Sequence, residues 1–163
     1  MKKLIKFTAK NQNNFDIGKI KKIHFVGIKG VGMASLAILA KERGISVTGS
    51  DVIEKFPTDS LLKKYNIVPL AGFKKDHISF DTDLVIYTGA HGGSTNTEVL
   101  YAKKHKIPVI AHGKAIGLFM KGKKGISVSG SHGKTTTSAM LASVLMDIGH
   151  DPSFAVGCGD IFL

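Results

Sequence analysis

The sequence predicts an α/β protein with a doubly wound, mostly parallel sheet, followed by the first strand and helix of a second α/β unit. Three observations predict it. Apolar strand patterns and helical patterns alternate five times, which favours parallel strands joined by right-handed helical crossovers. Two glycine-rich turns each stand between an apolar run and a helical pattern. A lysine- and glycine-containing junction over residues 121–125 separates the two units.

The first strand-turn-helix unit begins just after a polar N-terminal segment. The apolar run over residues 23–26 predicts a strand, and the glycines of residues 27–32 predict a turn. A helix follows over residues 33–43 and ends at Gly44, because glycine readily adopts the left-handed conformation that ends helices. Residues 45–48 predict the second strand.

The same alternation continues to the junction. The further elements expected in this unit are a helix from Thr58 or Asp59 to Tyr65, strands over 67–70, 83–87 and 107–110, and helices over 97–105 and 114–120. The run over 83–87 is continuously apolar, which is typical of a strand covered on both faces. Ligands of such sheets bind at the carboxyl ends of the strands.

Length and composition indicate one domain and part of a second. We expect a flexible, Asn-rich arm over residues 1–19, a ligand-binding domain over 20–121, and the start of a nucleotide-binding domain over 122–163. Because few residues follow the second glycine loop, too few for a complete ATPase domain, we expect the sequence to be part of a longer protein.

The charge balance is strongly basic, with 23 Lys and Arg against 12 Asp and Glu. Such an excess suggests polyanionic ligands such as nucleotides or sugar diphosphates, or simply a lysine-rich solvated surface. The lysines are dispersed in pairs without interleaved aromatic residues, so we expect no nucleic-acid partner. The single Cys158 excludes an internal disulfide, and no apolar segment suits a signal or membrane span, which predicts a cytoplasmic protein without a membrane partner.

The second glycine loop has the composition of a phosphate-binding loop. A predicted strand over 126–129 leads into Gly130-Ser131-His132-Gly133-Lys134-Thr135-Thr136 and a helix over 135–147. We expect Lys134 to bridge the β- and γ-phosphates of ATP, Thr135 to bind Mg²⁺ and Thr136 to donate to a phosphate oxygen. The pattern is a shortened form, because Val128 stands where the full pattern has glycine. The alternative is a glycine turn with a chance lysine.

The first glycine loop has the spacing Gly27-x-x-Gly30-x-Gly32, which differs from the spacing typical of NAD-binding proteins. Lys29 stands where such proteins have glycine, and it could neutralise a diphosphate. The loop therefore either binds an anionic ligand or serves only as a helix-entry turn. Asp51, at the end of the second strand, either accepts hydrogen bonds from a ribose or uracil or caps the next segment.

The histidines give weaker signals. We expect His24, inside the first strand, to be a core histidine with satisfied hydrogen bonds. His91 and His112 follow strand ends and are candidates for contact with a substrate. No pair of histidines has the spacing of metal ligands.

Two phosphate loops of different type, in successive α/β units, resemble the Mur ligase family of bacterial peptidoglycan synthesis. The resemblance covers residues 22–157, through His24-Phe25-Val26-Gly27-Ile28, Gly30-Val31-Gly32-Met33, Val47-Thr48-Gly49-Ser50-Asp51, the phosphate loop and Asp151-Pro152-Ser153-Phe154. Histidine at position 132 favours the branch that joins L-alanine to UDP-N-acetylmuramate, or the related branch that attaches a recycled tripeptide.

The resemblance implies ATP-dependent amide formation through an acyl phosphate, with ATP and Mg²⁺ bound at the second loop. It implies that the Rossmann-like first domain binds the UDP-sugar through Gly27, Lys29, Gly30, Val31, Gly32, Met33, Ser50 and Asp51. The L-alanine site, the adenine pocket and further magnesium ligands would lie outside this sequence, so this chain alone should bind UDP-sugar without catalysing.

Some residues depart from the family pattern near the expected sugar-nucleotide site. Asn96-Thr97-Glu98 stands for Asn-Pro-Glu, His112 for an arginine and Cys158 for a glycine, and the loop over 88–95 is glycine-rich and slightly long. Two other functions remain open: a nicotinamide-binding domain, which Lys29 and the second loop disfavour, and a UDP-sugar-binding module without catalysis.

Overall fold

The computed structural model describes residues 16–154 and 156, and it contains the predicted parallel sheet. The strands are β1 (Lys22–Val26), β2 (Ser46–Asp51), β3 (Leu70–Ala71), β4 (Leu84–Tyr87) and β5 (Val109–Ala111). Their order is β3-β2-β1-β4-β5, and all neighbouring strands pair in parallel. The doubly wound α/β fold class is therefore confirmed.

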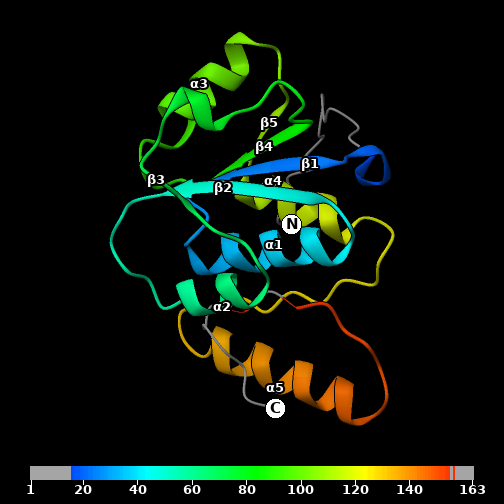
Figure 1. The fold of residues 1–163 in the computed structure, drawn as a ribbon. Coiled ribbons are helices and arrows are strands. Elements are labelled where there is room, and N and C mark those ends of the chain that lie inside the picture. Colours follow the sequence, from blue (N-terminus) through cyan, green and yellow to red (C-terminus); the bar gives the residue numbers. More distant parts are fainter. Residues whose placement is uncertain (1–15, 155, 157–163) are drawn as a thin grey trace, which may run out of the picture.

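The helices cover both faces of this sheet (Figure 1). They are α1 (Val31–Glu42), α2 (Asp59–Lys64), α3 (Thr97–Lys104), α4 (His112–Met120) and α5 (Lys134–Asp147), with short 3-10 helices η1 (Ile17–Lys19), η2 (Lys75–His77) and η3 (Gly93–Thr95). Figure 1 shows α1 and α4 on one face of the sheet and α3 on the opposite face. The α5 helix lies apart from the sheet, beyond α1 and α2.

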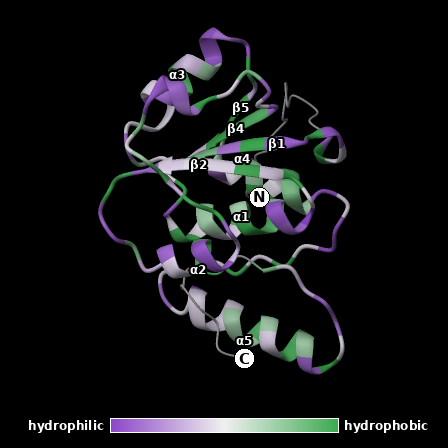
Figure 2. Cartoon of the chain, in the orientation of Figure 1, coloured by the Kyte–Doolittle hydropathy of each residue, from purple (hydrophilic) through white to green (hydrophobic). Residues whose placement is uncertain are grey.

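The core consists of two apolar layers, one on each face, because alternate residues of a strand point to opposite sides. Ile23 and Phe25 of β1 pack in the larger layer with α1 and α4. Val26 and Val85 pack in the smaller layer with Val99 of α3. Figure 2 shows hydrophobic residues in β1, β4 and β5 and along α1, whereas most of β2 is pale. The site at the strand ends is therefore held by a rigid, doubly covered sheet.

The element boundaries differ from the predictions where hydrogen bonding overrides hydropathy. The α1 and α4 helices begin two residues earlier than expected, at Val31 and His112. The third strand is reduced to Leu70–Ala71, because only Ser50 and Asp51 of β2 pair with it. The fifth strand starts after Pro108, whose nitrogen carries no hydrogen to donate.

The predicted strand over residues 126–129 is wrong, since these residues have no strand conformation. A strand needs a neighbour for its backbone groups, and no described strand pairs with this segment. The helix that follows does form, one residue longer than predicted at its start. This part of the second unit is thus a loop leading into a helix.

The segment predicted as a flexible arm over residues 1–19 contains η1 at its C-terminal end. Asp16 accepts a hydrogen bond from the Gly18 backbone, and η1 follows directly. Ile17 and Ile20 pack against the larger core layer, and this apolar contact orders the segment. Residues 1–15 and Cys158 lie outside the described part of the chain.

Helices long and apolar enough to cross a bilayer do not occur within residues 16–154.

Gly49 provides a test of this packing. A methyl group there would lie 2.5 Å from the Ile28 side chain and 2.8 Å from the Phe25 carbonyl oxygen. We expect Gly49→Ala to lower the free energy of unfolding by about 1–3 kcal/mol, because the backbone oxygen cannot move aside. Urea unfolding followed by circular dichroism measures this.

Gly117 in α4 supplies the matched control, because nothing lies within 4 Å of a methyl group built there. Gly117→Ala should raise stability by about 0.5–1 kcal/mol through helix propensity. Equal effects of the two substitutions would contradict the packing of the glycine loop against β1 and β2.

Candidate functional site

The candidate site lies where the strand order reverses. The chain leaves β1 toward β2 on one side, whereas it leaves β4 toward β5 on the other. The loops that follow β1 and β4 therefore diverge at the carboxyl edge of the sheet, and such a crevice is where doubly wound sheets bind ligands. The first glycine loop follows β1, and the loop over 88–95 follows β4.

The first glycine loop is fixed by β2. The backbone nitrogens of Gly27 and Ile28 both donate to the Ser50 carbonyl oxygen, at 2.9 and 3.1 Å. Gly27 has φ +82°, and a Cβ there would lie 2.3 Å from Thr88 Cγ2, so only glycine fits. Gly30 is the N-cap of α1, whose first turn contains Val31, Gly32 and Met33. The first backbone N–H groups of a helix lack intrahelical partners, so this end of α1 suits an anion.

Lys29 does not point its charge at a ligand site in this structure. Its side chain is 10% exposed, and its Nζ donates to the Glu54 carbonyl oxygen at 2.8 Å. The same Nζ lies 3.5 Å from Asp59 Oδ1. Thr58, predicted to cap α2, instead donates its hydroxyl hydrogen to the Lys29 carbonyl oxygen at 2.5 Å. Lys29 therefore ties the segment before α2 to the glycine loop, and its contact with a diphosphate stays a prediction.

Asp51 is buried at the end of β2, and its carboxylate accepts a backbone hydrogen bond from the first glycine loop. One carboxylate oxygen accepts from the Lys29 backbone nitrogen at 2.7 Å, and the other accepts from the Val52 backbone nitrogen at 2.8 Å. The second oxygen also lies 3.5 Å from His91 Nε2. The structure thus supports the capping interpretation of Asp51, while its predicted contact with a ribose or uracil remains untested.

Ser50 is joined to a buried carboxylate that the sequence reasoning missed. Its hydroxyl donates a short hydrogen bond to Glu98 Oε2. His24 Nε2 lies 3.4 Å from the same oxygen, and His77 Nδ1 lies 2.7 Å from Oε1. The Lys74 backbone nitrogen also donates to Oε1, at 3.1 Å. We call these five residues the Glu98 cluster. His24 is confirmed as a core histidine, since its Nδ1 also contacts the Thr48 hydroxyl.

The Glu98 cluster keeps a charge inside the protein. Burial raises the pKa of the Glu98 carboxyl, but hydrogen bonds from His24, Ser50 and His77 outweigh it, so the pKa lies below its ordinary value. The carboxylate is therefore ionised at neutral pH and accepts from all four partners. Acidic residues are rarely fully buried without such partners, so its burial marks a structural centre.

The Asn96-Thr97-Glu98 motif places this carboxylate. Asn96 caps α3 by accepting from the Glu98 backbone nitrogen at 2.9 Å. Thr97 takes the first helical position, where proline is also well tolerated, so the departure from Asn-Pro-Glu leaves the helix start unchanged. An acidic residue at the second position of a predicted helix was the available signal, but its burial depends on strands distant in sequence.

The histidines after β4 and β5 stand at opposite ends of the glycine loop. The His91 ring approaches Gly27, where its Cδ2 would lie 3.6 Å from an added Cβ. His112, in the first turn of α4, approaches Gly32, where its Nε2 would lie 2.7 Å from an added Cβ. That Nε2 atom is buried and has no hydrogen-bond partner within the described residues. Both candidates therefore lie beside the loop.

The second glycine loop precedes α5 directly. Gly133 is the N-cap of α5, with φ +76°, and Lys134, Thr135 and Thr136 form the first turn. The Lys134 Nζ donates to the carbonyl oxygens of Gly130 and Ser131, at 2.6 and 3.1 Å. All residues from Gly130 to Thr136 are exposed. An ammonium above the loop, a helix N-terminus and free hydroxyls are the groups that suit nucleotide phosphates and a phosphate-bound Mg²⁺.

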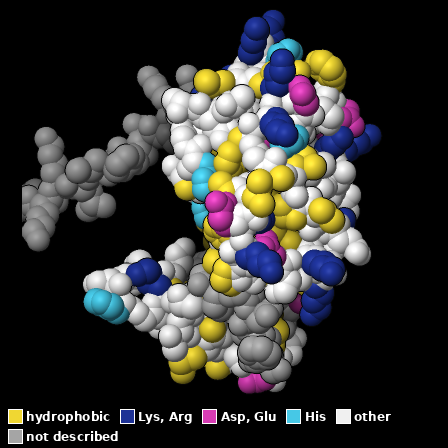
Figure 3. Space-filling view, turned by 60° about the vertical axis from the view of Figure 1, so that its left-hand side comes forward, with side chains coloured by type: hydrophobic (Ala, Val, Ile, Leu, Met, Phe, Trp, Pro, Cys, Tyr) yellow, Lys and Arg dark blue, Asp and Glu magenta, His cyan; other side chains and the backbone are white. Residues whose placement is uncertain are grey.

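Figure 3 shows a hollow between the sheet-containing part of the molecule and a lower arm that carries exposed Lys and His side chains. Histidine atoms are also exposed on the wall of the sheet-containing part that borders this hollow. Within residues 16–154, no group of three or more His, Cys, Asp or Glu side chains is arranged to bind a metal ion.

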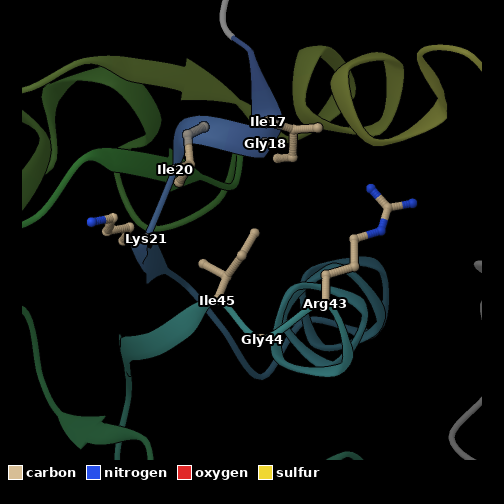
Figure 4. Close-up of a pocket in the computed structure, with 7 residues that line it drawn as sticks. All are labelled: Ile17, Gly18, Ile20, Lys21, Arg43, Gly44 and Ile45. Atoms are coloured by element: carbon tan, nitrogen blue, oxygen red, sulfur yellow. The ribbon is translucent and has the colours of Figure 1, made fainter.

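A separate hollow of about 480 Å³ lies at the edge of the sheet where the strands begin. It is lined by Ile17, Lys21, Arg43 and Ile45 among others, where η1 meets the C-terminal end of α1 (Figure 4). These residues precede β1 and β2, so the hollow faces the amino ends of the strands. Ligands of doubly wound sheets bind at the opposite edge, so we assign it no role.

Comparison with known proteins gives consistent matches. The sequence pattern described as "Mur ligase family, catalytic domain" matches residues 22–124, a range that ends before the second glycine loop. Proteins named UDP-N-acetylmuramate–L-alanine ligase match at 38% identity in Chlorobaculum parvum and 43% in Clostridium kluyveri. These matches cover 87% and 88% of this chain but 30% and 31% of the relatives. The chain thus spans under a third of their length.

Solved structures of two related ligases share this fold. The UDP-N-acetylmuramate–alanine ligase of Thermotoga maritima matches with TM-score 0.69 and 35% identity, over 78% of this chain and 29% of that one. A murein peptide ligase from Psychrobacter arcticus matches with TM-score 0.71 and 31% identity, over 79% and 27%. Fold and sequence therefore agree on the same group of proteins.

We expect Glu98→Gln to lower the free energy of unfolding by about 2–4 kcal/mol at pH 7, because an amide offers one acceptor oxygen to four donors that are buried or partly buried. The lowered pKa of Glu98 stabilises the fold above the pKa of the unfolded carboxyl, and this stability is lost as pH falls through the folded pKa. The free energy of unfolding, measured with denaturant between pH 3 and 7, should therefore fall less steeply toward acid pH in the variant than in wild type. Glu54→Gln, at an exposed side chain, is the control. Equal acid slopes for Glu98→Gln and wild type would contradict the assignment.

Gly32 and His112 allow a double-mutant test. We expect Gly32→Ala to destabilise the protein, because the new methyl group meets the His112 ring. In a His112→Ala background the same substitution should stabilise by about 0.5–1 kcal/mol through helix propensity. Thermal unfolding of the four proteins measures the coupling. Additive effects would show that the two residues do not touch.

Proposed function

Because this chain belongs to the Mur ligase family, we propose that it forms the UDP-sugar-binding domain and the first part of the ATP-binding domain of a UDP-N-acetylmuramate–L-alanine ligase. The supporting observation is the pair of glycine loops, one at the strand-order reversal and one at the start of α5. We place the domain boundary near residues 121–122, after α4. The whole protein would use ATP to join L-alanine to the muramate carboxylate.

The first loop would bind the diphosphate of the UDP-sugar. Val31, Gly32 and Met33 would present their backbone N–H groups at the N-terminus of α1, where the helix dipole favours an anion, and Gly27 and Gly30 would form the turn that leads to it. Ser50, Asp51 and Lys29 would take part mainly by holding this loop, because their polar groups already bond to it or to its neighbours.

The second loop would bind ATP. Lys134 would move its ammonium from the loop carbonyls to the β- and γ-phosphates, and Gly130, Ser131, His132 and Gly133 would surround them. Thr135 would hold Mg²⁺ and Thr136 a phosphate oxygen. When bound, Mg²⁺ would neutralise negative charge on the γ-phosphoryl group as this group passes from ATP to the muramate carboxylate. Positioning by Lys134 and the loop amides is this chain's contribution to that step.

A second function deserves comparison, because a murein peptide ligase matches the fold as well as the alanine ligase does. In that case the amine donor would be a recycled tripeptide. The curated relatives with 38–43% identity are named alanine ligases, which favours L-alanine.

We also propose a cytoplasmic enzyme without nucleic-acid or membrane partners, in agreement with the nucleotide ligands proposed for it.

Calorimetry with residues 1–163 tests the two loops separately. Wild type should bind UDP-N-acetylmuramate, and it should bind Mg-ATP more weakly, through the phosphates alone, because the adenine pocket would lie outside this sequence. We expect Gly30→Asp to weaken the UDP-sugar by about tenfold or more, because a carboxylate beside the α1 N-terminus repels the diphosphate. Lys134→Ala should abolish ATP binding and leave UDP-sugar binding unchanged.

Gly117→Asp in α4 is the charge-matched control, since space is open around Gly117. Failure of wild type to bind any UDP compound, together with binding of NADH, would overturn the ligase proposal in favour of a nicotinamide-binding domain. If Lys134→Ala bound neither the UDP-sugar nor ATP, the proposal that the two loops form separate binding sites would be contradicted.

A further inference from the structure

We propose that His91 is a ligand-contacting residue that binds the diphosphate of the sugar nucleotide, an inference that rests on the proposed function of the first domain. His91 lies in the loop after β4, across the strand-order reversal from the first glycine loop. The two loops border the crevice in which sheets of this type bind ligands. The assignment depends on its backbone, its neighbours and the surrounding charges.

The backbone of His91 is in an unfavourable conformation. Three described non-glycine residues have positive φ: Asn66, His91 and Lys106. Asn66 and Lys106 directly follow the ends of α2 and α3, where a left-handed residue commonly ends a helix. His91 ends no helix, and the next two residues, which share its positive φ, are glycines. Glycine would adopt this backbone conformation at lower cost, so the presence of the histidine side chain here indicates that the side chain has a role.

Neighbouring residues hold the imidazole at the glycine loop. Asn96, the cap of α3, donates its Nδ2 hydrogen to the His91 carbonyl oxygen at 3.0 Å and so fixes the strained backbone. The ring lies 5.1 Å from the Phe73 ring, centroid to centroid, and its Nε2 lies 3.5 Å from Asp51 Oδ1. Its Cδ2 approaches Gly27. The side chain remains 28% exposed, so a ligand on the loop can reach it.

The charges around the loop leave room for a further anion-binding group. Lys29, the cation in the loop itself, directs its ammonium to the backbone carbonyl oxygen of Glu54 and to the carboxylate of Asp59. The Asp51 carboxylate lies directly behind the loop, and it would repel a diphosphate unless a donor stood between them. The His91 ring, beside Asp51 and Gly27, can donate a hydrogen bond to a phosphate oxygen from this position. The ring is therefore the contact that allows an anion next to a buried carboxylate.

Replacing His91 by glycine should lower the affinity for UDP without lowering the stability of the protein. Calorimetry of wild type, His91→Gly and His91→Asn with UDP and UMP tests this on residues 1–163. We expect both variants to weaken UDP binding by about tenfold or more, the size of a lost charge-assisted hydrogen bond. The wild-type preference for UDP over UMP should shrink in both. The melting temperature of His91→Gly should stay equal or rise, because glycine relieves the left-handed strain.

His105→Asn is the matched control, because His105 is also exposed but lies at the C-terminal end of α3. It should leave UDP affinity unchanged. Wild-type UDP affinity in both His91 variants would overturn this inference while leaving the proposed function intact, as would equal weakening of UDP and UMP. Absence of UDP binding by wild type would overturn the inference and the proposed function together.

Discussion

The ionised carboxylate of Glu98 holds α3 to β1, to β2 and to the segment that contains η2. A buried charge must be matched by donors, and here they come from β1, β2 and the segment that includes η2, while Glu98 itself belongs to α3. These interactions fix α3 on its face of the sheet and hold the segment at residues 74–77 against it. Apolar contacts alone would be less directional, so the carboxylate sets the geometry of this half of the domain.

The same network reaches the first glycine loop through one residue. Ser50 donates its hydroxyl hydrogen to Glu98 and accepts the backbone hydrogens of Gly27 and Ile28 at its carbonyl oxygen. Asp51 continues this support by accepting from Lys29. The loop is thus held from behind by buried polar groups, and its outer side keeps the N-terminus of α1 available. Such preorganisation suits anion binding, since little reordering is needed when the ligand arrives.

The second glycine loop is built differently. Its conformation depends on local groups, namely the left-handed Gly133, the first turn of α5 and the Lys134 ammonium bonded to loop carbonyls. The residues before it form no strand, and the loop is exposed throughout. A cation resting on carbonyl oxygens can exchange them for phosphate oxygens with little change of charge environment. The two loops therefore represent a buried, sheet-supported site and an exposed, locally formed one.

Local patterns in the sequence were enough to predict the doubly wound sheet, the α-helices of the described residues and both glycine loops, because hydrophobic period and glycine position are local properties. It also identified His24 as a core residue and His91 and His112 as neighbours of strand ends. Three features became apparent only in three dimensions: residues 126–129 form no strand, Lys29 donates to the Glu54 carbonyl oxygen, and Glu98 is buried among four donors. Those outcomes depend on partners distant in sequence, which supply or withhold the hydrogen bonds that a local pattern cannot specify.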